Sequence, residues 1–252
     1  MSRTFPTPAL AACVALLAAG SAFAEPLETP VTIRVKAHDA KFIGSGVGEM
    51  NVIVEDAETG AFLAAGRIAG GTGDTERLMK TPIARAATLA DDKTAAYVAR
   101  LKLERPTRIR IRVSGPLEPS DSTQELTVTT WVVPGRPIGG DGIVLTLPGL
   151  IVAPVLQATT NGRVPLVADV KLMCGCPITR GGIWDAADYE VRALVEHEGH
   201  PAGDATLAFT GETNRFAGAI AVPAPGRYLI TVWAHDSKTG NTGATHYTVD
   251  VP

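Results

Sequence analysis

The sequence predicts an all-β protein in which two antiparallel β-sandwich domains follow a cleaved signal peptide. Three features predict this architecture. Apolar and polar residues alternate along short segments in both halves, clusters of Gly, Pro and Asp separate these segments, and helical periodicity is hard to find. Alternation with one face towards water is typical of antiparallel sheets, which pack only their other face against a core.

The first half contains five expected strands. Residues 31–38 place Val, Ile, Val and Ala on one face and Thr, Arg, Lys and His on the other, and residues 107–113 place arginines outside. The remaining three strands are expected at Met50–Glu55, Tyr97–Leu103 and Leu126–Val133. Turn-forming stretches between them, such as DAETG, favour short connections.

The second half repeats this style with six expected strands. They lie at Val164–Leu172, Tyr189–Glu196, Ala205–Phe209, Phe216–Val222, Tyr228–His235 and Thr245–Val251. Turns are expected at 198–201, 223–226 and 237–241, where Gly, Pro, Asn and Ser gather. Short, regularly spaced strands of this kind indicate a sandwich.

The C-terminal stretch PGRYLITVWAHDSKTGNTGATHYTVDV resembles the closing hairpin of bacterial immunoglobulin-like (Ig-like) domains. The resemblance implies a final strand pair that directs aromatic residues inward after a Pro-Gly turn. It concerns the C-terminal domain, about a third of the chain. The first half loosely resembles a transthyretin-like or Ig-like sandwich.

Four segments follow from these patterns. Residues 1–24 form the signal peptide, 25–135 an N-terminal β-sandwich domain, and 163–252 a C-terminal Ig-like β-sandwich domain. Residues 136–162 are too apolar for a free linker, so we expect a last strand of the first domain or a seam packed between the domains. Each half is long enough to bury its own core.

The N-terminus has the features of a secretory signal. Arg3 supplies positive charge, residues 9–19 form an apolar run, and Ala22-Phe23-Ala24 fits the small-residue pattern that precedes a cleavage site. The run is too short to span a bilayer comfortably. Lipid attachment at Cys13 is the alternative. We therefore expect a periplasmic or secreted protein that is cleaved after Ala24.

The charge balance narrows the class of partner. A formal net charge of −3 argues against general nucleic-acid binding, which favours strongly basic domains. No later stretch is long and unbroken enough to suggest a membrane span. We expect the partner to be another exported protein or a small ligand.

Two of the three cysteines, Cys174 and Cys176, lie one residue apart beside Met173. Strand parity puts both sulfurs on the apolar face and Met173 on the opposite face. The pair could form a local disulfide, bind a soft ion such as Cu(I), exchange thiols, or pack as small apolar residues. In an extended chain their Cα atoms lie near the upper limit for a disulfide, so such a ring is expected to be strained and easily reduced.

Four histidines are candidates to complete a copper site with these sulfurs: His197, His200, His235 and His246. The stretch HEGH is one residue shorter than the H-E-x-x-H motif and lies at a turn, so we reject a metalloprotease. A hairpin centred between residues 240 and 241 would bring His235 and His246 level, directly opposite each other on its two strands. Solvated strand histidines are nevertheless the commoner case.

Trp184 and Asp185 follow two glycines in the loop after the cysteines, where the aromatic ring could contact a ligand or close the end of the core. This loop is the first candidate surface for a partner, because it concentrates Met173, Cys174, Cys176, Trp184 and Asp185. Trp131 and Trp233 lie in expected strands and are interpreted as packing or sheet-face residues.

Arg108, Arg110 and Arg112 form a basic stripe along one expected strand. The planar guanidinium suits recognition of carboxylate or phosphate groups. Pairing with acidic residues on a neighbouring strand, such as Glu49 or Glu55, is the interpretation that we favour.

The preferred hypothesis is an exported, non-enzymatic binding or accessory protein that uses loops at the ends of its sandwiches. The alternative is a copper-handling or thiol-redox protein that uses the Met-Cys-Gly-Cys motif. The sequence contains no G-x-S-x-G nucleophile elbow. Because catalytic groups can converge in space, an enzyme with an unrecognised site is a third hypothesis.

We predict that the exported protein begins at Glu25. Replacing Ala22 with arginine should block processing, because the residue three positions before the cleaved bond must be small. Intact-mass measurement of the protein from the cell envelope would show the loss of residues 1–24 in the wild type and their retention in the variant. Lipid on Cys13, or an unprocessed wild-type chain in the cytosol, would contradict the prediction.

Overall fold

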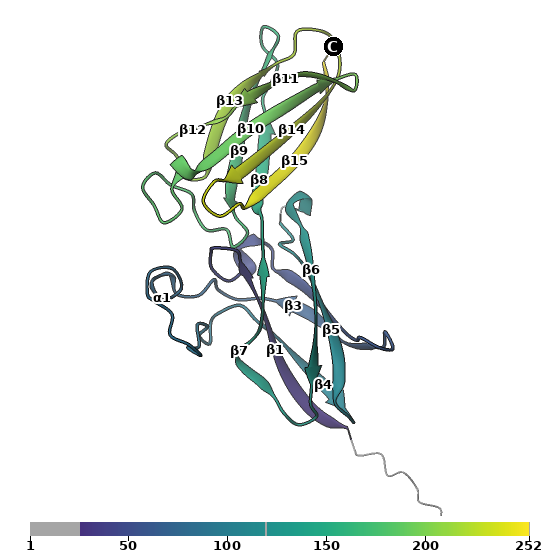
Figure 1. The fold of residues 1–252 in the computed structure, drawn as a ribbon. Coiled ribbons are helices and arrows are strands. Elements are labelled where there is room, and N and C mark those ends of the chain that lie inside the picture. Colours follow the sequence, from purple (N-terminus) through teal and green to yellow (C-terminus); the bar gives the residue numbers. More distant parts are fainter. Residues whose placement is uncertain (1–25, 119, 252) are drawn as a thin grey trace, which may run out of the picture.

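The computed structural model describes residues 26–118 and 120–251, which form two β-sandwich domains placed end to end (Figure 1). The all-β class and the two sandwiches predicted from the sequence are confirmed. The expected signal peptide and its cleavage site lie outside the described residues. Within the described part of the chain, no helix is long and apolar enough to cross a membrane.

The first domain consists of a three-stranded and a four-stranded sheet. The smaller sheet has the order β4 (Tyr97–Leu103), β1 (Leu27–Ala37) and β7 (Ile138–Leu147). The larger sheet has the order β3 (Phe62–Ile68), β2 (Met50–Asp56), β5 (Thr107–Gly115) and β6 (Gln124–Val132). Its strands are antiparallel, whereas in the smaller sheet β1 and β7 run parallel.

The second domain contains two four-stranded antiparallel sheets. One has the order β11 (His200–Thr206), β10 (Tyr189–His197), β14 (Gly226–Asp236) and β15 (Thr242–Val251). The other has the order β12 (Ala208–Phe209), β13 (Arg215–Ala221), β9 (Arg163–Leu172) and β8 (Leu150–Leu156). The β14–β15 pair is the closing hairpin implied by the Ig-like resemblance.

Most expected strands are present, but three differences from expectation occur. The strand expected at Ala205–Phe209 is divided at Leu207, so that its first residues belong to β11 and its last two form β12 in the other sheet. β3 has the sequence FLAAGRI, whose Ala and Gly residues give no alternation to detect. β11 begins at His200, inside an expected turn, because the connection after β10 contains only Glu198 and Gly199. Almost every residue of β11 is exposed, so it is an edge strand with no apolar face that a sequence pattern could reveal.

Among the described residues, the helical segments are short, and all of them lie in connections between strands. They are η1 (Ser45–Val47), α1 (Thr75–Met79), η2 (Ser120–Ser122) and η3 (Ala186–Asp188). Helix α1 lies in a long excursion, residues 69–96, between β3 and β4. There Leu78 packs with Phe42 and Ala90 in a small core of its own. A helix of five residues is too short to produce a detectable periodicity.

The same turn closes one hairpin in each domain. Asp56 and Asp236 each accept hydrogen bonds from the backbone N–H groups two and three residues later. Gly60 and Gly240 adopt positive φ angles of 74° and 76°, and each donates its N–H to the carbonyl of the Asp. The repeated pattern D-x-x-T-G therefore specifies this turn wherever it occurs in the chain.

Only Pro148 and Gly149 separate the last strand of the first domain from the first strand of the second (Figure 1). Gly149 has a φ of 121°, and a Cβ built on it would lie 2.6 Å from Cε of Met173. Both restrictions favour glycine at this position. The segment 136–162 contributes a strand to each sandwich, and the two strands follow each other through the junction.

Asn241 joins the two domains by hydrogen bonds from a buried side chain. Its Nδ2 donates to the carbonyl of His38 at 3.1 Å, and its Oδ1 accepts from the N–H of Gly149 at 2.9 Å. The residue is 2% exposed. The hairpin turn of β14–β15 is thereby fixed to the end of β1 and to the connection between the domains.

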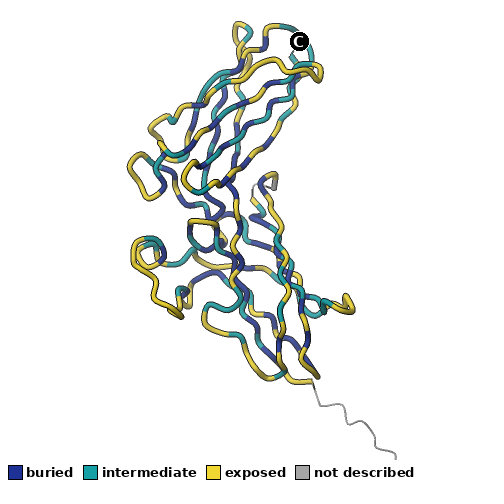
Figure 2. Tube along the Cα trace, in the orientation of Figure 1, coloured by how far each residue is buried: buried dark blue, intermediate teal, exposed yellow. Residues whose placement is uncertain are grey.

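The hydrophobic core continues through the junction. One cluster of buried apolar side chains includes members from both sandwiches, and buried segments persist through the region where the domains meet (Figure 2). Ser122, in the β5–β6 connection, accepts a hydrogen bond from the N–H of Val152 in β8 at 3.4 Å. The two domains are therefore packed against each other as well as covalently linked.

Replacing Asn241 with alanine should weaken the junction. The N–H of Gly149 and the carbonyl of His38 would each lose a partner, at a cost of about 1–3 kcal/mol for a buried polar group. We expect a loss of about 2 kcal/mol in the free energy of unfolding, measured by denaturant titration. Asn51→Ala, at an exposed position of β2, is the matched control. Equal stability of the two variants would contradict the prediction.

Candidate functional site

Cys174 and Cys176 form a disulfide, with their Cα atoms 5.3 Å apart. The backbone between them is turned, because Gly175 has a φ of 75° and donates its N–H to the carbonyl of Leu172 at 2.7 Å. The extended geometry expected from the sequence is therefore wrong, and the Cα separation lies inside the ordinary disulfide range. A sequence reading that continues the strand through Gly175 misses this turn.

Both cysteines lie in the interior, each 3% exposed, and Met173 is fully buried beside them. The expectation that Met173 points away from the apolar side is wrong: its side chain lies against Gly149 in the junction. The disulfide uses both sulfurs, so neither is a thiolate, the form in which cysteine binds a metal ion. Among the described residues, no group of three or more His, Cys, Asp or Glu side chains is arranged to hold a metal ion.

The four candidate histidines are dispersed over the second domain. His197 stacks on the ring of Tyr228 with centroids 4.4 Å apart, and His200 lies opposite it across the β10–β11 turn. His235 pairs with Thr242, whereas His246 pairs with Thr231. The expectation that His235 and His246 lie level is wrong, because the turn is centred two residues earlier than assumed.

Trp184 and Asp185 also have structural surroundings. The indole of Trp184 is 6% exposed, and its Nε1 donates to the carbonyl of Asp39 in the first domain at 3.0 Å. Asp185 caps η3 by accepting from the N–H of Ala187, and this hydrogen bond is the main cause of its lowered pKa. Trp184 therefore contacts the first domain, whereas Asp185 caps a turn of its own domain.

Tyr189 ends this loop in a buried position beside Asp236. Burial raises the pKa of its hydroxyl, and the carboxylates of Asp236, Asp39 and Asp188 raise that pKa further. The phenol therefore stays neutral over the physiological range. Of the side chains in this loop, Ile183 is the large apolar one that solvent reaches.

The outward side of the sheet β3-β2-β5-β6, here called the outer face, has a different composition. Among the described Phe, Tyr and Trp residues, only Phe62 and Trp131 are exposed, at 69% and 58%. The strand register pairs Phe62 with Glu55 and Trp131 with Arg108. Trp131 points to the same side as Arg108 because directly paired residues share a side of the sheet. Phe62 follows a β-bulge in β3, and since its neighbour Leu63 packs against the core, the exposed Phe62 ring points to the outer face with Glu55.

The arginine stripe runs along the middle of the outer face. Arg112 contacts Glu55 at 2.9 Å, and Arg110 lies 4.0 Å from the same carboxylate. The favoured interpretation of cross-strand pairing with Glu55 is thus confirmed for these two arginines. Glu49, the other candidate, lies 3.7 Å from Arg67 of β3 instead.

Arg108 differs from the other two arginines of the stripe. Within residues 26–118 and 120–251 it has no carboxylate within ion-pair distance, and its Nη2 lies 3.5 Å from Oγ1 of Thr129. The second domain has a similar cross-strand pair, Trp233 opposite Arg192. There, however, the guanidinium contacts both Glu190 and Asp204. Arg108 is therefore an exposed cation beside an exposed indole, with its charge available to a ligand.

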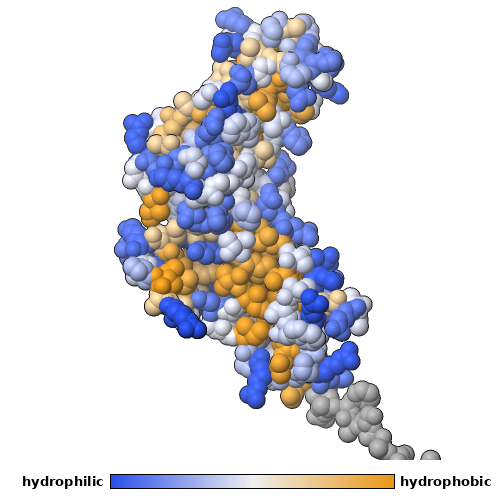
Figure 3. All heavy atoms as spheres, in the orientation of Figure 1, coloured by the Kyte–Doolittle hydropathy of each residue, from blue (hydrophilic) through white to orange (hydrophobic). Residues whose placement is uncertain are grey.

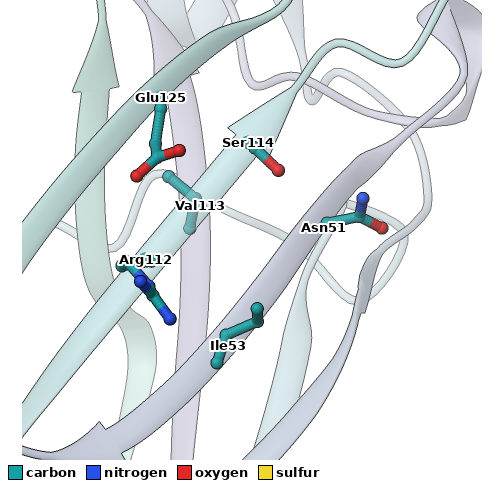
Figure 4. A pocket seen from close by; sticks show the side chains of 6 residues that line it. All are labelled: Asn51, Ile53, Arg112, Val113, Ser114 and Glu125. Atoms are coloured by element: carbon teal, nitrogen blue, oxygen red, sulfur yellow. The ribbon is translucent and has the colours of Figure 1, made fainter.

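The end of the outer face nearest the second domain is hollowed (Figure 4). This shallow, open depression of about 240 Å³ is lined by Asn51, Ile53, Arg112, Val113, Ser114 and Glu125. Figure 4 shows the side chains of these residues on neighbouring strands. Ile53 is 37% exposed and supplies apolar surface.

The opposite face of the first domain is partly covered. Asp141 of β7 accepts hydrogen bonds from the backbone N–H groups of Leu89 and Ala90, which fixes the excursion 69–96 to that side. Arg34 of β1 is nearly buried there and donates to the carbonyl of Gly140. In the view of Figure 3, hydrophobic side chains gather over the first domain near α1, whereas the second domain is mainly hydrophilic. The excursion thus covers part of the three-stranded sheet, and Val98 and Val144 of that sheet remain exposed.

The sequence indicates only the arginine stripe of this face, for which carboxylate or phosphate recognition is the less favoured interpretation. The sequence pattern does not predict the strand that contains Phe62, and it favours packing or a sheet-face position for Trp131. The sequence nevertheless contains an indication of the exposure of Trp131. In an alternating strand, Trp131 points to the same side as Thr127 and Thr129, which is the polar side of β6. An aromatic ring on the polar side of an alternating strand is an indication of binding.

No family model matches the chain, and no curated protein matches it in sequence. The alpha chain of the chicken interferon gamma receptor is a similar solved structure, with 13% identity, 91% of this chain and 100% of that chain covered, and a TM-score of 0.34. A DUF3823 family protein from Bacteroides ovatus has 10% identity, 88% and 99% coverage and a TM-score of 0.33. These similarities concern the β-sandwich fold alone.

We predict that the Cys174–Cys176 disulfide resists reduction in the native protein, because both sulfurs are buried. Thiol titration should find no free thiol until denaturant is added together with a reductant. Replacing both cysteines with alanine should lower the free energy of unfolding by about 1–2 kcal/mol, since the closed loop is very short. Two titratable thiols in the folded, untreated protein would contradict the prediction.

Proposed function

We propose that the chain is an exported binding protein that presents the outer face of its first domain to a ligand. The observation that carries this proposal is the exposure of Phe62 and Trp131 on one side of an ordered sheet. When a ligand covers large aromatic rings, their apolar surface is removed from water, which favours binding. Such rings dominate the energetics of many binding surfaces. The unneutralised Arg108 adds a directional polar contact beside Trp131.

The loop of residues 173–185, which the sequence indicates as the first candidate surface, has a structural role in this proposal. Cys174 and Cys176 are buried and bonded to each other, and Trp184 is buried and donates to a carbonyl of the first domain, so none of the three is accessible to a partner. The second domain then serves as a support that fixes the orientation of the first. The expected signal peptide would deliver the protein to the periplasm or the exterior, where its ligand would be found.

Site-specific photocrosslinking tests the proposal in the cell that produces the protein. A photoreactive phenylalanine analogue at Thr127, on the outer face of the edge strand β6, should form a defined adduct in the cell envelope. The adduct should disappear when Trp131→Ala and Phe62→Ala are added, because the ligand would lose both aromatic contacts.

The matched control places the same analogue at Val155, which is 65% exposed on β8 of the second domain. We expect no defined adduct there. Absence of an adduct at Thr127, or an adduct there that persists in the double variant, would overturn the proposed function.

A further inference from the structure

We infer that the ligand of the outer face is an acidic oligosaccharide, bound across the strands between Phe62 and Trp131 with a carboxylate on Arg108. This inference rests on the proposed function and specifies its ligand class. It draws on the spacing of the two rings, the position of the charges between them and the polar groups around them.

The two aromatic rings lie on opposite edges of the sheet. Phe62 is in β3 and Trp131 is in β6, which are the first and last strands in the order β3-β2-β5-β6. Neighbouring strands are about 4.8 Å apart, so the two positions are separated by roughly 14 Å across the sheet. One sugar ring cannot contact both, whereas a linear chain of linked rings can place one ring on each aromatic side chain.

The charged residues occupy the centre of this path. The register aligns Phe62 with Glu55, Glu55 with Arg110, and Arg110 with Thr129, and Arg108 pairs with Trp131 at the far edge. Protein–protein interfaces have the reverse arrangement, with aromatic residues at a dry centre and charges on a wet rim. A polar chain whose rings also have apolar faces matches a charged centre between two aromatic edges.

Arg108 is the residue from which we infer that the ligand is acidic. Its guanidinium is exposed and has no carboxylate partner among the described residues, in contrast to Arg192 beside Trp233. The planar fork can form two parallel hydrogen bonds with one carboxylate, which a lysine cannot reproduce. A sugar acid resting on Trp131 would place its carboxylate within reach of this fork.

Neutral polar groups complete the surface. Thr127 and Thr129 of β6 are exposed, alternate with half-buried positions and lie on the outer face, where their hydroxyl groups can both donate and accept hydrogen bonds. Asn51 and Ser114 line the hollow at the other end of the face. A saccharide rich in hydroxyl groups would satisfy these residues better than an aliphatic ligand would.

The shallowness of the outer face indicates an extended ligand and not a compact one. The hollow there is shallow and open, while a site for a single small molecule normally encloses most of its ligand in a concave cavity. A chain that lies along an open surface needs no enclosure, because its affinity is distributed over several contacts. The outer face therefore suits a segment of a longer acidic polysaccharide.

Binding of three probes to the mature full-length protein tests the inference: an oligogalacturonate chain, the same chain with its carboxylates methyl-esterified, and poly-L-glutamate. Isothermal titration and the change in tryptophan fluorescence would measure affinity. We expect the oligogalacturonate to bind, its methyl ester to bind at least about tenfold more weakly, and poly-L-glutamate to bind far more weakly than the sugar acid.

Variants assign the contacts. Trp131→Ala and Phe62→Ala should each weaken oligogalacturonate binding about tenfold, and Arg108→Ala should weaken it by a similar factor or more. Arg108→Lys should recover only part of the affinity, because lysine keeps the charge and loses the fork. Val155→Ala and Arg227→Ala, at exposed positions of the second domain, should leave binding unchanged.

Three outcomes would overturn the inference: no binding of oligogalacturonate, equal binding of its methyl ester, or equal binding of poly-L-glutamate. The last would identify an acidic polypeptide as the ligand class. If the inference failed while the Thr127 adduct still depended on Phe62 and Trp131, the outer face would remain a binding site for another ligand. Loss of both results would remove the proposed function as well.

Discussion

The packed junction between the domains is the constraint on which the rest of the structure depends. Two residues, Pro148 and Gly149, connect a strand of each sandwich, and such a short connection forces the domain ends into contact. Surfaces brought this close must exclude water or satisfy every polar group that they bury. Asn241 does so for two backbone groups, and the core continues beside it.

This requirement explains why the loop after β9 contains the least common residues of the chain. Met173 fills the space beside Gly149, and Gly175 lies so close to Val47 that a Cβ on it would be 2.9 Å from the valine Cγ1. The disulfide fixes the turn at Gly175, and Trp184 reaches across to a backbone carbonyl of the first domain. Residues that resemble a metal or redox site are here the parts of an interdomain joint.

The outer face of the first domain lies outside the packed junction between the domains. The outer face of the first domain is a sheet whose side chains are positioned by strand register, so we expect little ordering when the proposed ligand binds. Glu55 contacts Arg112 and lies 4.0 Å from Arg110, whereas Arg108 has no carboxylate partner among the described residues. Two arginines of the stripe are thus close to a carboxylate within the sheet, and the third is the one that we propose as a ligand contact.

The sequence by itself determined the all-β class, the two sandwiches, most strand positions and the two D-x-x-T-G turns, because these follow from local alternation and backbone preference. It also placed Arg108 on the polar side of its strand, whereas for Trp131 it left a packing position and a sheet-face position open. Only the tertiary structure decided that Trp184 contacts the other domain, that Cys174 and Cys176 are joined across a turn, that His235 and His246 are not level, and that Phe62 shares a face with Trp131. Those facts depend on which strands are neighbours and in what register, and residues distant in sequence set both through packing.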